Sequence, residues 1–431
     1  MMFKKLILLC LILLLSVNLY ILYAQDNLFA SYTTSPGRIK LYHNLVNQSI
    51  NKNLALPISD TTEEKWQEAF WALELLEYKT SWVDQRIQNA FDSIDYCSND
   101  FKRGLIELAY TNYPSAFINN VLEILHKTDD PKIFVMGAEY LLQHDANSNT
   151  YRIIEDQIKN KLSVFPTDNP LINMVQQRMR ELKHLSPPLK SNKFFTDLLN
   201  KNFLPGETIL YSFQRKNRDF AGLAMVRNKE GKFIRDSANK IFNVSQLARS
   251  LSNLPGYITN GSTPQGIFRM KGFDVSLSHF IGPTPNIQLS MPVEATLQHF
   301  LKDSCITDTT WTIDHYSGLL PQNLKNYLPL YNTYYAGLAG RSEIIAHGTT
   351  IDPEYYKGKN YYPHTPSLGC LCAKEIWNGK RMESNQQKLV FALLTAGGAD
   401  GYCVVIEIDD KQQPVTIDEI LPQLLKAESI K

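Results

Sequence analysis

The sequence predicts an α+β protein whose N-terminal half is helical and whose C-terminal half is mainly β. Between residues 59 and 185 the apolar residues recur at helical intervals. After residue 205 short segments rich in β-branched and aromatic residues alternate with glycine and proline. The chain has 431 residues, of which 44% are hydrophobic. This is enough apolar material to fill the cores of two or three domains.

In the helical half, Thr61 and Glu64 have the spacing of a capping box, and Asp130 precedes a proline at the first position of a helix. Helical segments are expected at about residues 61–76, 83–91, 101–110, 115–125, 131–143, 151–162 and 170–182. Each amphipathic helix needs a neighbour to cover its apolar face. We therefore predict that residues 59–185 form stacked helical hairpins, either a HEAT-like repeat or an irregular helical domain.

The second half begins after a proline-rich break at Ser186-Pro187-Pro188, and residues 186–204 are predicted to be a linker. The β domain is expected to span residues 205–412, followed by a C-terminal tail at 413–431. Within it we expect strands at residues 208–213, 220–227 and 402–408, a short helix at 243–251 and a longer helix at 384–396.

The N-terminus has the features of an export signal. Lys4 and Lys5 precede an apolar stretch that ends near Ala24, a residue suited to signal peptidase cleavage. Residues 1–24 are therefore predicted to be a signal peptide that directs the protein to the periplasm or another extracytoplasmic site. A retained membrane anchor is the alternative, because the apolar stretch nearly reaches the length of a membrane span. Residues 25–58 are polar and mixed, and are expected to form an N-terminal arm.

The net charge and the number of cysteines argue against two classes of protein, the nucleic-acid-binding proteins and the disulfide scaffolds. The formal net charge is +1, which gives no reason to expect a nucleic acid partner. Five cysteines remain after residue 24, an odd number spread over a long chain, so this is not a disulfide scaffold. In an oxidising compartment an unpaired cysteine needs a buried position or a chemical role.

The densest group of reactive residues is His347-Gly348-Thr349, followed by Ser367-Leu368-Gly369-Cys370. A thiol attacks a carbonyl as its thiolate, so it needs a base nearby and donors that stabilise negative charge. His347 is the candidate base. Gly369 allows a tight turn, after which the backbone amides of Gly369 and Cys370 are expected to bind an oxyanion. A helix that began within residues 372–377 would lower the thiol pKa further through its dipole.

These residues resemble the signature of the L,D-transpeptidases, the YkuD-like cysteine enzymes of bacterial cell wall biogenesis. The His-Gly-Thr and Ser-x-Gly-Cys segments are joined by a third match, because Thr263-Pro264-Gln265-Gly266 is similar to the Thr-Pro-x-Gly segment of that family. The three segments occur in the family's order, and the resemblance covers about residues 205–410. It implies a YkuD-like β-sandwich catalytic domain that transfers acyl groups between peptidoglycan stem peptides, without a metal or an organic cofactor.

The resemblance also implies a role for each matched residue. Cys370 would carry the acyl group, His347 would accept the thiol proton, and the Gly348 carbonyl would orient the imidazole. Ser367 and Gly369 would shape the oxyanion site. The substrate-binding residues expected around them are Thr349, His364, Leu368, Thr263 and Gly266.

Two positions depart from the family pattern. Leu368 stands where the family usually has histidine, and Cys372 stands where it often has asparagine or arginine. His364 is a candidate to replace the missing imidazole, or else an ordinary loop histidine. Cys372 is expected to be structural, or to protect Cys370 by thiol exchange or pair with Cys305. A zinc site built from Cys370, Cys372, His364 and His347 is a weaker alternative, because Cys-x-Cys lacks the usual two-residue gap of structural zinc sites.

Three functions follow from these observations. The first is a peptidoglycan L,D-transpeptidase that passes the acyl group from Cys370 to an amine. The second is a carboxypeptidase or endopeptidase that resolves the same acyl-enzyme with water. The third is a non-catalytic exported protein that binds stem peptides and recruits a cell-wall assembly partner through its helical half, in which case Cys370 and His347 are core residues.

Overall fold

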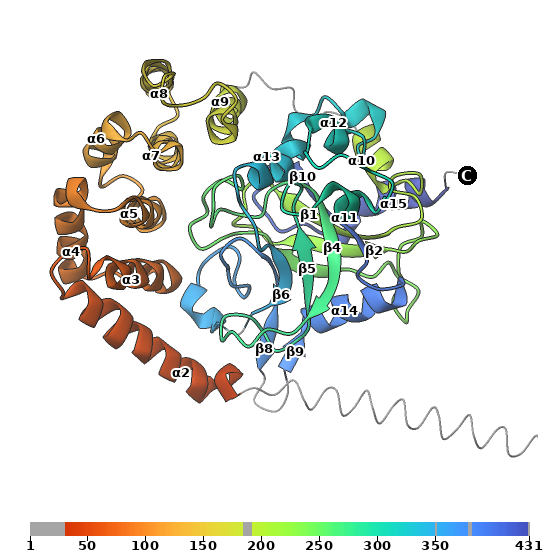
Figure 1. The fold of residues 1–431 in the computed structure, drawn as a ribbon. Helices are drawn as coiled ribbons and strands as arrows, with labels where there is room; N and C mark the ends of the chain where they lie inside the picture. Colours follow the sequence, from red (N-terminus) through yellow and green to blue (C-terminus); the bar gives the residue numbers. More distant parts are fainter. Residues whose placement is uncertain (1–30, 184–191, 350, 378–381, 430–431) are drawn as a thin grey trace, which may run out of the picture.

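The computed structural model describes residues 31–183, 192–349, 351–377 and 382–429 (Figure 1). The helical segments of the first half form a curved array beside a β-barrel formed by the second half. The predicted signal peptide, residues 1–24, lies outside the described residues. Among the described helices, none combines the length and the apolar character that a membrane crossing requires.

The N-terminal arm is helical. A 3-10 turn at Ser31–Thr33 leads into α2 (Ser35–Asn44), which continues as a wider π-helical segment at Leu45–Lys52. The Thr34 side chain accepts a hydrogen bond from the amide of Gly37, so α2 starts at a capped end. The polar composition of the described part of this arm, residues 31–58, reflects helical segments with one buried side, since Leu45 and Ile50 are buried against the next helices.

The next seven helices stack as hairpins in two rows. Helices α3, α5, α7 and α9 contact one another in turn and form the inner row, while α4, α6 and α8 lie outside them (Figure 1). This arrangement agrees with the predicted stacked hairpins. The bounds of the helices are α3 (Glu63–Leu76), α4 (Ser81–Asp92), α5 (Asn99–Asn112), α6 (Ile118–Lys127), α7 (Pro131–His144), α8 (Ser148–Asn160) and α9 (Pro170–Leu182).

Side-chain caps define most of these helix starts. Asp130 accepts hydrogen bonds from the amides of Lys132 and Ile133, as its position before a proline predicts. The capping box expected at Thr61 and Glu64 does not form. Helix α3 begins instead after Thr62, whose hydroxyl donates to the carbonyl of Pro57 and fixes the preceding turn.

Eight of the described strands close into one barrel, in the order β1-β10-β4-β5-β6-β7-β3-β2. The α+β class predicted from the sequence is confirmed. The strands form a closed barrel where a two-sheet sandwich was expected, because β1 pairs with both β2 and β10 while β7 joins β6 to β3. The bounds are β1 (Thr208–Arg215), β2 (Gly222–Arg227), β3 (Val244–Leu247), β4 (Gly266–Asp274), β5 (Asn286–Ser290), β6 (Ile345–Gly348), β7 (Leu371–Ala373) and β10 (Gly401–Asp409), with a separate hairpin of β8 (Glu375–Trp377) and β9 (Met382–Ser384).

Helices also surround the barrel, so alternate residues of its strands enter two separate cores. Ile209 and Tyr211 pack in one core with α15, whereas Leu210 packs in the other with α14. This explains why β1 and β2 are buried along their whole length. The helices of this half are α10 (Asn192–Leu199), α11 (Leu297–Leu301), α12 (Ile313–Ser317), α13 (Asn332–Leu338), α14 (Asn385–Thr395) and α15 (Ile417–Ser429).

Several local predictions are corrected here. Residues 243–251 contain strand β3 instead of a helix, and residues 372–377 belong to β7 and β8, so no helix dipole acts on the thiols of this region. The predicted linker contains α10, and residues 184–191 within it lie outside the described part of the chain. The expected C-terminal tail forms α15, which packs on α10.

The helical array and the barrel share one hydrophobic core. Residues of two barrel loops, among them Tyr257 and Tyr356, are buried in the same cluster as the inner helices. Hydrogen bonds reinforce this contact: the Tyr257 hydroxyl donates to Glu139 of α7 at 2.6 Å, and the Tyr356 hydroxyl donates to the carbonyl of Leu75 at 2.8 Å. The helical array therefore supports the loops that flank the candidate site.

Candidate active site

The parallel pairing of β6 and β7 brings the predicted histidine beside a cysteine, but beside a different one from that expected. His347 lies opposite Cys372 in the register of the two strands. Its Nε2 atom is 3.5 Å from the Sγ atom of Cys372. Cys370 comes two residues earlier, directly before β7 begins at Leu371. The predicted direct pair of His347 with Cys370 is corrected to a pair with Cys372.

The imidazole of His347 is held in one orientation by the backbone. Its Nδ1 atom donates to the carbonyl oxygen of Gly348 at 2.8 Å, which is the contact predicted for that carbonyl. The Nε2 lone pair then faces the Cys372 thiol, which donates to it. Burial lowers the pKa of His347 from 6.5 to about 4. The ring is neutral at pH 7 and can accept a proton.

The two thiols differ in access and in electrostatic setting. Cys370 is partly exposed, and its Sγ lies 3.9 Å from the carbonyl oxygen of Glu343. Burial raises its pKa, while the backbone N–H of Ile345 and the charge of Arg341 lower it. Cys372 is only 1% exposed, and its pKa is raised by burial and by the nearby sulfur of Cys370. Cys370 is therefore the thiol that a substrate can reach.

A tight turn at Ser367 presents Cys370. Gly369 has φ +111°, a backbone conformation that favours glycine. The Oγ atom of Ser367 accepts hydrogen bonds from the amides of Gly369 at 3.1 Å and of Cys370 at 2.8 Å. These two amides were expected to bind an oxyanion, and that expectation is corrected, because the Ser367 hydroxyl already occupies them.

Arg341 is a residue of the site that the sequence analysis missed. Its buried guanidinium donates to the carbonyls of Gly256, Gly261 and Ser262 and lies against the Cα of Gly369, where a side chain would collide with it. Burial lowers the pKa of Arg341 to about 10, and the Cys370 thiolate opposes that change. The arginine thus places a positive charge beneath the turn that carries the thiol. No motif surrounds Arg341 in the sequence, so no local signal marked it.

Glu375 is a second residue that the sequence analysis missed. It is 3% exposed, and its Oε1 atom accepts hydrogen bonds from the hydroxyls of Thr284 and Ser384. A side chain at position 348 would overlap its carboxyl group, which explains the glycine after His347. Burial raises the pKa of Glu375, while its hydrogen bonds from Ser384 and Thr284 lower it.

Of the remaining residues predicted to bind substrate, some contact or form the turn before Cys370 and others lie elsewhere in the barrel. The Thr263 hydroxyl donates to the carbonyl of Gly369 at 2.8 Å, so this threonine supports the turn from below. Leu368, which belongs to the turn, is 46% exposed. Thr349 is buried after β6, where its hydroxyl accepts from the amide of Ile351. Gly266 faces Tyr316 and Thr333 on the side of α12 and α13, away from the turn.

His364, the candidate to replace the family histidine, makes its described hydrogen bonds to other residues. It is buried, with Nε2 3.0 Å from the Ser245 hydroxyl and Nδ1 3.2 Å from the Tyr361 carbonyl. Burial lowers its pKa to about 4. Cys305 is an exposed free thiol and Cys372 is also free, so the two form no disulfide here. Within the described ranges no three histidine, cysteine or acidic side chains gather as metal ligands do.

Neither the family models, nor the curated proteins, nor the solved structures gave a significant match. The functional assignment therefore depends on the residues of the site.

Proposed function

We propose that this chain is an exported cysteine acyltransferase that acts on peptidoglycan stem peptides in the manner of the L,D-transpeptidases. One observation carries the proposal: a partly exposed thiol, a neutral buried imidazole and a buried arginine meet where β6 and β7 pair. A nucleophile, a base and a positive charge are the groups that thiol acyl transfer needs. The barrel is then a closed form of the YkuD-like catalytic domain.

Cys370 is the nucleophile in this proposal because access decides between the two thiols. An acyl donor of peptide size must approach the sulfur along its line of attack, and Cys372 is sealed beneath the strand pair. Arg341 and the Ile345 amide both favour the Cys370 thiolate. Among the residues that the structure describes, no comparable cation lowers the pKa of Cys372, which is raised by burial and then by the neighbouring sulfur.

The base acts through the second thiol. Cys372 donates its proton to Nε2 of His347 and receives the proton of Cys370, so that the thiolate forms at the exposed sulfur. The thiolate adds to the carbonyl of the donor stem, and the imidazolium returns a proton to the departing amine. The amine of a second stem then attacks the thioester and regenerates the Cys370 thiol. Water in place of that amine gives the hydrolase that the same acyl-enzyme also permits.

A carbapenem is a suitable probe, because it acylates thiols of this class of enzyme. We expect intact-protein mass spectrometry to detect one adduct, with peptide mapping placing it on Cys370. The Cys370→Ala variant should form none. The Cys305→Ala variant is the matched control, since Cys305 is an exposed thiol without the surrounding groups.

The outcome also separates the functions. An adduct on Cys370 followed by tetrapeptide dimers in a muropeptide assay indicates transfer, whereas trimmed stems indicate hydrolysis. A folded protein that forms no adduct, or reacts equally at Cys305, contradicts the enzyme and leaves the binding protein as the explanation.

A further inference from the structure

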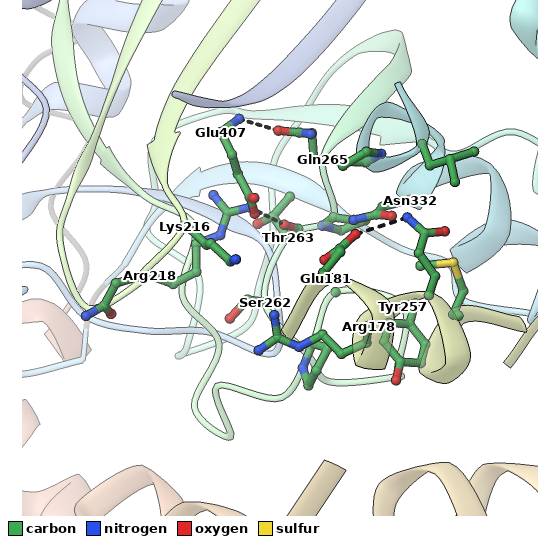
Figure 2. A pocket seen from close by; sticks show the side chains of 18 of the residues that line it. Arg178, Glu181, Lys216, Arg218, Tyr257, Ser262, Thr263, Gln265, Asn332 and Glu407 are labelled. Atoms are coloured by element: carbon green, nitrogen blue, oxygen red, sulfur yellow. Dashed lines mark hydrogen bonds and ion pairs between the residues drawn. The ribbon is translucent and has the colours of Figure 1, made fainter. Parts of the chain in front are cut away.

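A cavity of about 760 Å³ lies between the helical array and the barrel. Its volume falls in the range of about 300–1,000 Å³ that is typical of small-molecule sites. One wall is α9, which contributes Arg178 and Glu181, and the opposite wall is the barrel, which contributes Lys216, Arg218 and Glu407 (Figure 2). The cavity is thus lined by charges of both signs that come from the two halves of the chain.

Two carboxyl groups converge in this cavity. Glu181 accepts a hydrogen bond from Gln177. Burial raises its pKa and the charge of Glu407 raises it further, while the Gln177 hydrogen bond and the charges of Arg178 and Lys216 lower it. Both carboxylates also act on the phenol of Tyr327, whose pKa is raised by burial and then by Glu407 and Glu181. The two acids from opposite walls and this tyrosine line the same cavity. A positively charged group between them would relieve their repulsion.

Hydrogen-bond donors without a partner lie beside these acids. Gln265 is 1% exposed, and its Nε2 atom has no acceptor among the described residues, although its Oε1 accepts from the amide of Glu407. Arg218 is 7% exposed, and its Nη2 donates to Glu407 at 2.8 Å while its Nη1 has no acceptor in the described part of the chain. Buried donors of this kind are normally satisfied, so each calls for an acceptor supplied by a ligand.

From these groups we infer that the cavity binds a short zwitterionic peptide, with its ammonium group between Glu181 and Glu407 and its carboxylate at Gln265 and Arg218. A phosphate-bearing ligand fits less well, because the two carboxylates would repel it. A simple cation would leave the two donors unsatisfied. The inference depends on the cavity alone and makes no use of the reaction proposed for Cys370.

The cavity shares a wall with the candidate active site. The carbonyl of Thr263 accepts from Arg218 at 3.3 Å inside the cavity, and the hydroxyl of the same residue donates to Gly369 in the turn before Cys370. An occupant would therefore lie behind the turn without touching the thiol. Substitution of Cys370 by alanine should leave peptide binding unchanged, so the two proposals can fail separately.

Capped peptides test the inference directly. Isothermal titration calorimetry of the full chain would compare trialanine, in its all-L and all-D forms, with N-acetyl-trialanine and with trialanine amide. We expect one free trialanine enantiomer to bind at least about tenfold more tightly than either of its capped forms, since each cap removes one charge. Equal binding of free and capped peptides, or no binding of any of them at millimolar concentration, would overturn the inference.

Two variants test which cavity residue binds the ammonium end of the peptide and which binds its carboxylate end. Glu181→Gln should weaken trialanine and its amide, which keep the ammonium, and leave N-acetyl-trialanine unaffected. Gln265→Glu removes the free donor but keeps the acceptor for the Glu407 amide, and should weaken only peptides with a free carboxylate. Glu123→Gln, on the exposed side of α6, is the matched control. If both pocket variants keep the wild-type circular dichroism and melting temperature and bind all peptides as the control does, the inference is wrong.

Discussion

The Nε2 atom of His347 lies 3.5 Å from the sulfur of Cys372, while the accessible sulfur belongs to Cys370, two residues earlier in the chain. The imidazole is therefore paired with a buried thiol, and the proposed mechanism uses this thiol to pass the proton of Cys370 to the base. A buried thiol between an imidazole and a reactive sulfur is a means of moving a proton without opening the core, because each sulfur can donate one proton and accept another.

Replacement of Cys372 tests this arrangement. Cys372→Ala should slow acylation of Cys370 by about 10²-fold, the scale of a lost general base. Cys372→Ser should slow it less, since a hydroxyl can still donate and accept. The rates are measured by stopped-flow absorbance during β-lactam ring opening. Cys403→Ala, a buried thiol elsewhere in the barrel, is the control. An unchanged rate in Cys372→Ala would show that the thiol of Cys370 is activated without it.

Arg341 should control the reactivity of Cys370 through its charge. Arg341→Met removes the cation that lowers the Cys370 pKa, so alkylation by iodoacetamide should shift to higher pH. Arg341→Lys keeps the charge and should preserve the pH midpoint, although it loses hydrogen bonds to the carbonyls of the 256–262 loop and some stability. The pH dependence of alkylation at Cys370, followed by mass spectrometry, separates the two effects. Equal midpoints in both variants would assign Arg341 a purely structural role.

The sequence predicted the turn before Cys370 better than it predicted the partner of His347. Serine, glycine and cysteine at positions 367, 369 and 370 form the expected turn, because a glycine with positive φ and a hydroxyl that accepts backbone amides are local properties. The partner of His347 is a matter of strand register. A shift of two residues in the pairing of β6 with β7 would exchange Cys372 for Cys370, and nothing in either short strand encodes that choice locally.

The fold shows the same division between local and distant information. The long amphipathic helices were predictable from their periodicity, as was the strand at Gly401–Asp409. Residues 243–251 were expected to form a helix, yet Val244–Leu247 pairs with β2 and β7 and fills a gap in the barrel. Arg341 could not be recognised either, since its acceptors lie about 80 residues earlier in the chain.

His364 should make the stability of the protein depend on pH between about 6.5 and 4. Burial lowers its pKa from 6.5 to about 4. As the pH falls through this window the unfolded chain binds a proton that the folded chain excludes. The stability due to the neutral ring is therefore complete above pH 6.5 and declines as the pH approaches 4, by up to about 3 kcal/mol.

Urea denaturation of the wild type and of His364→Gln at pH 7 and pH 4.5 measures this effect. We expect the stability difference between the two proteins to shrink at the lower pH. His144→Gln, at an exposed histidine of α7, supplies the baseline. A difference that is the same at both pH values would mean that His364 does not titrate in the expected window.

The buried pair of Glu74 and Glu107 should act in the opposite sense. Burial raises the pKa of both carboxyl groups, and the charge of Glu107 raises that of Glu74 further. A group whose folded pKa is raised stabilises the fold at low pH and loses that contribution as the pH rises through the folded pKa. Because Asn260 of the barrel donates to Glu107 at 3.2 Å, the pair also lies at the contact between the two halves.

Glu74→Gln replaces one acid of this pair with a neutral side chain of the same shape. We expect the variant to lose less stability than the wild type when the pH is raised from 5 to 8.5, measured as the free energy of unfolding in urea. Glu64→Gln, at an exposed position of the same helix α3, controls for the loss of one negative charge. If Glu74→Gln and Glu64→Gln change the pH dependence equally, Glu74 does not hold a proton in the folded protein. The contact between helices and barrel would then be insensitive to pH in this range.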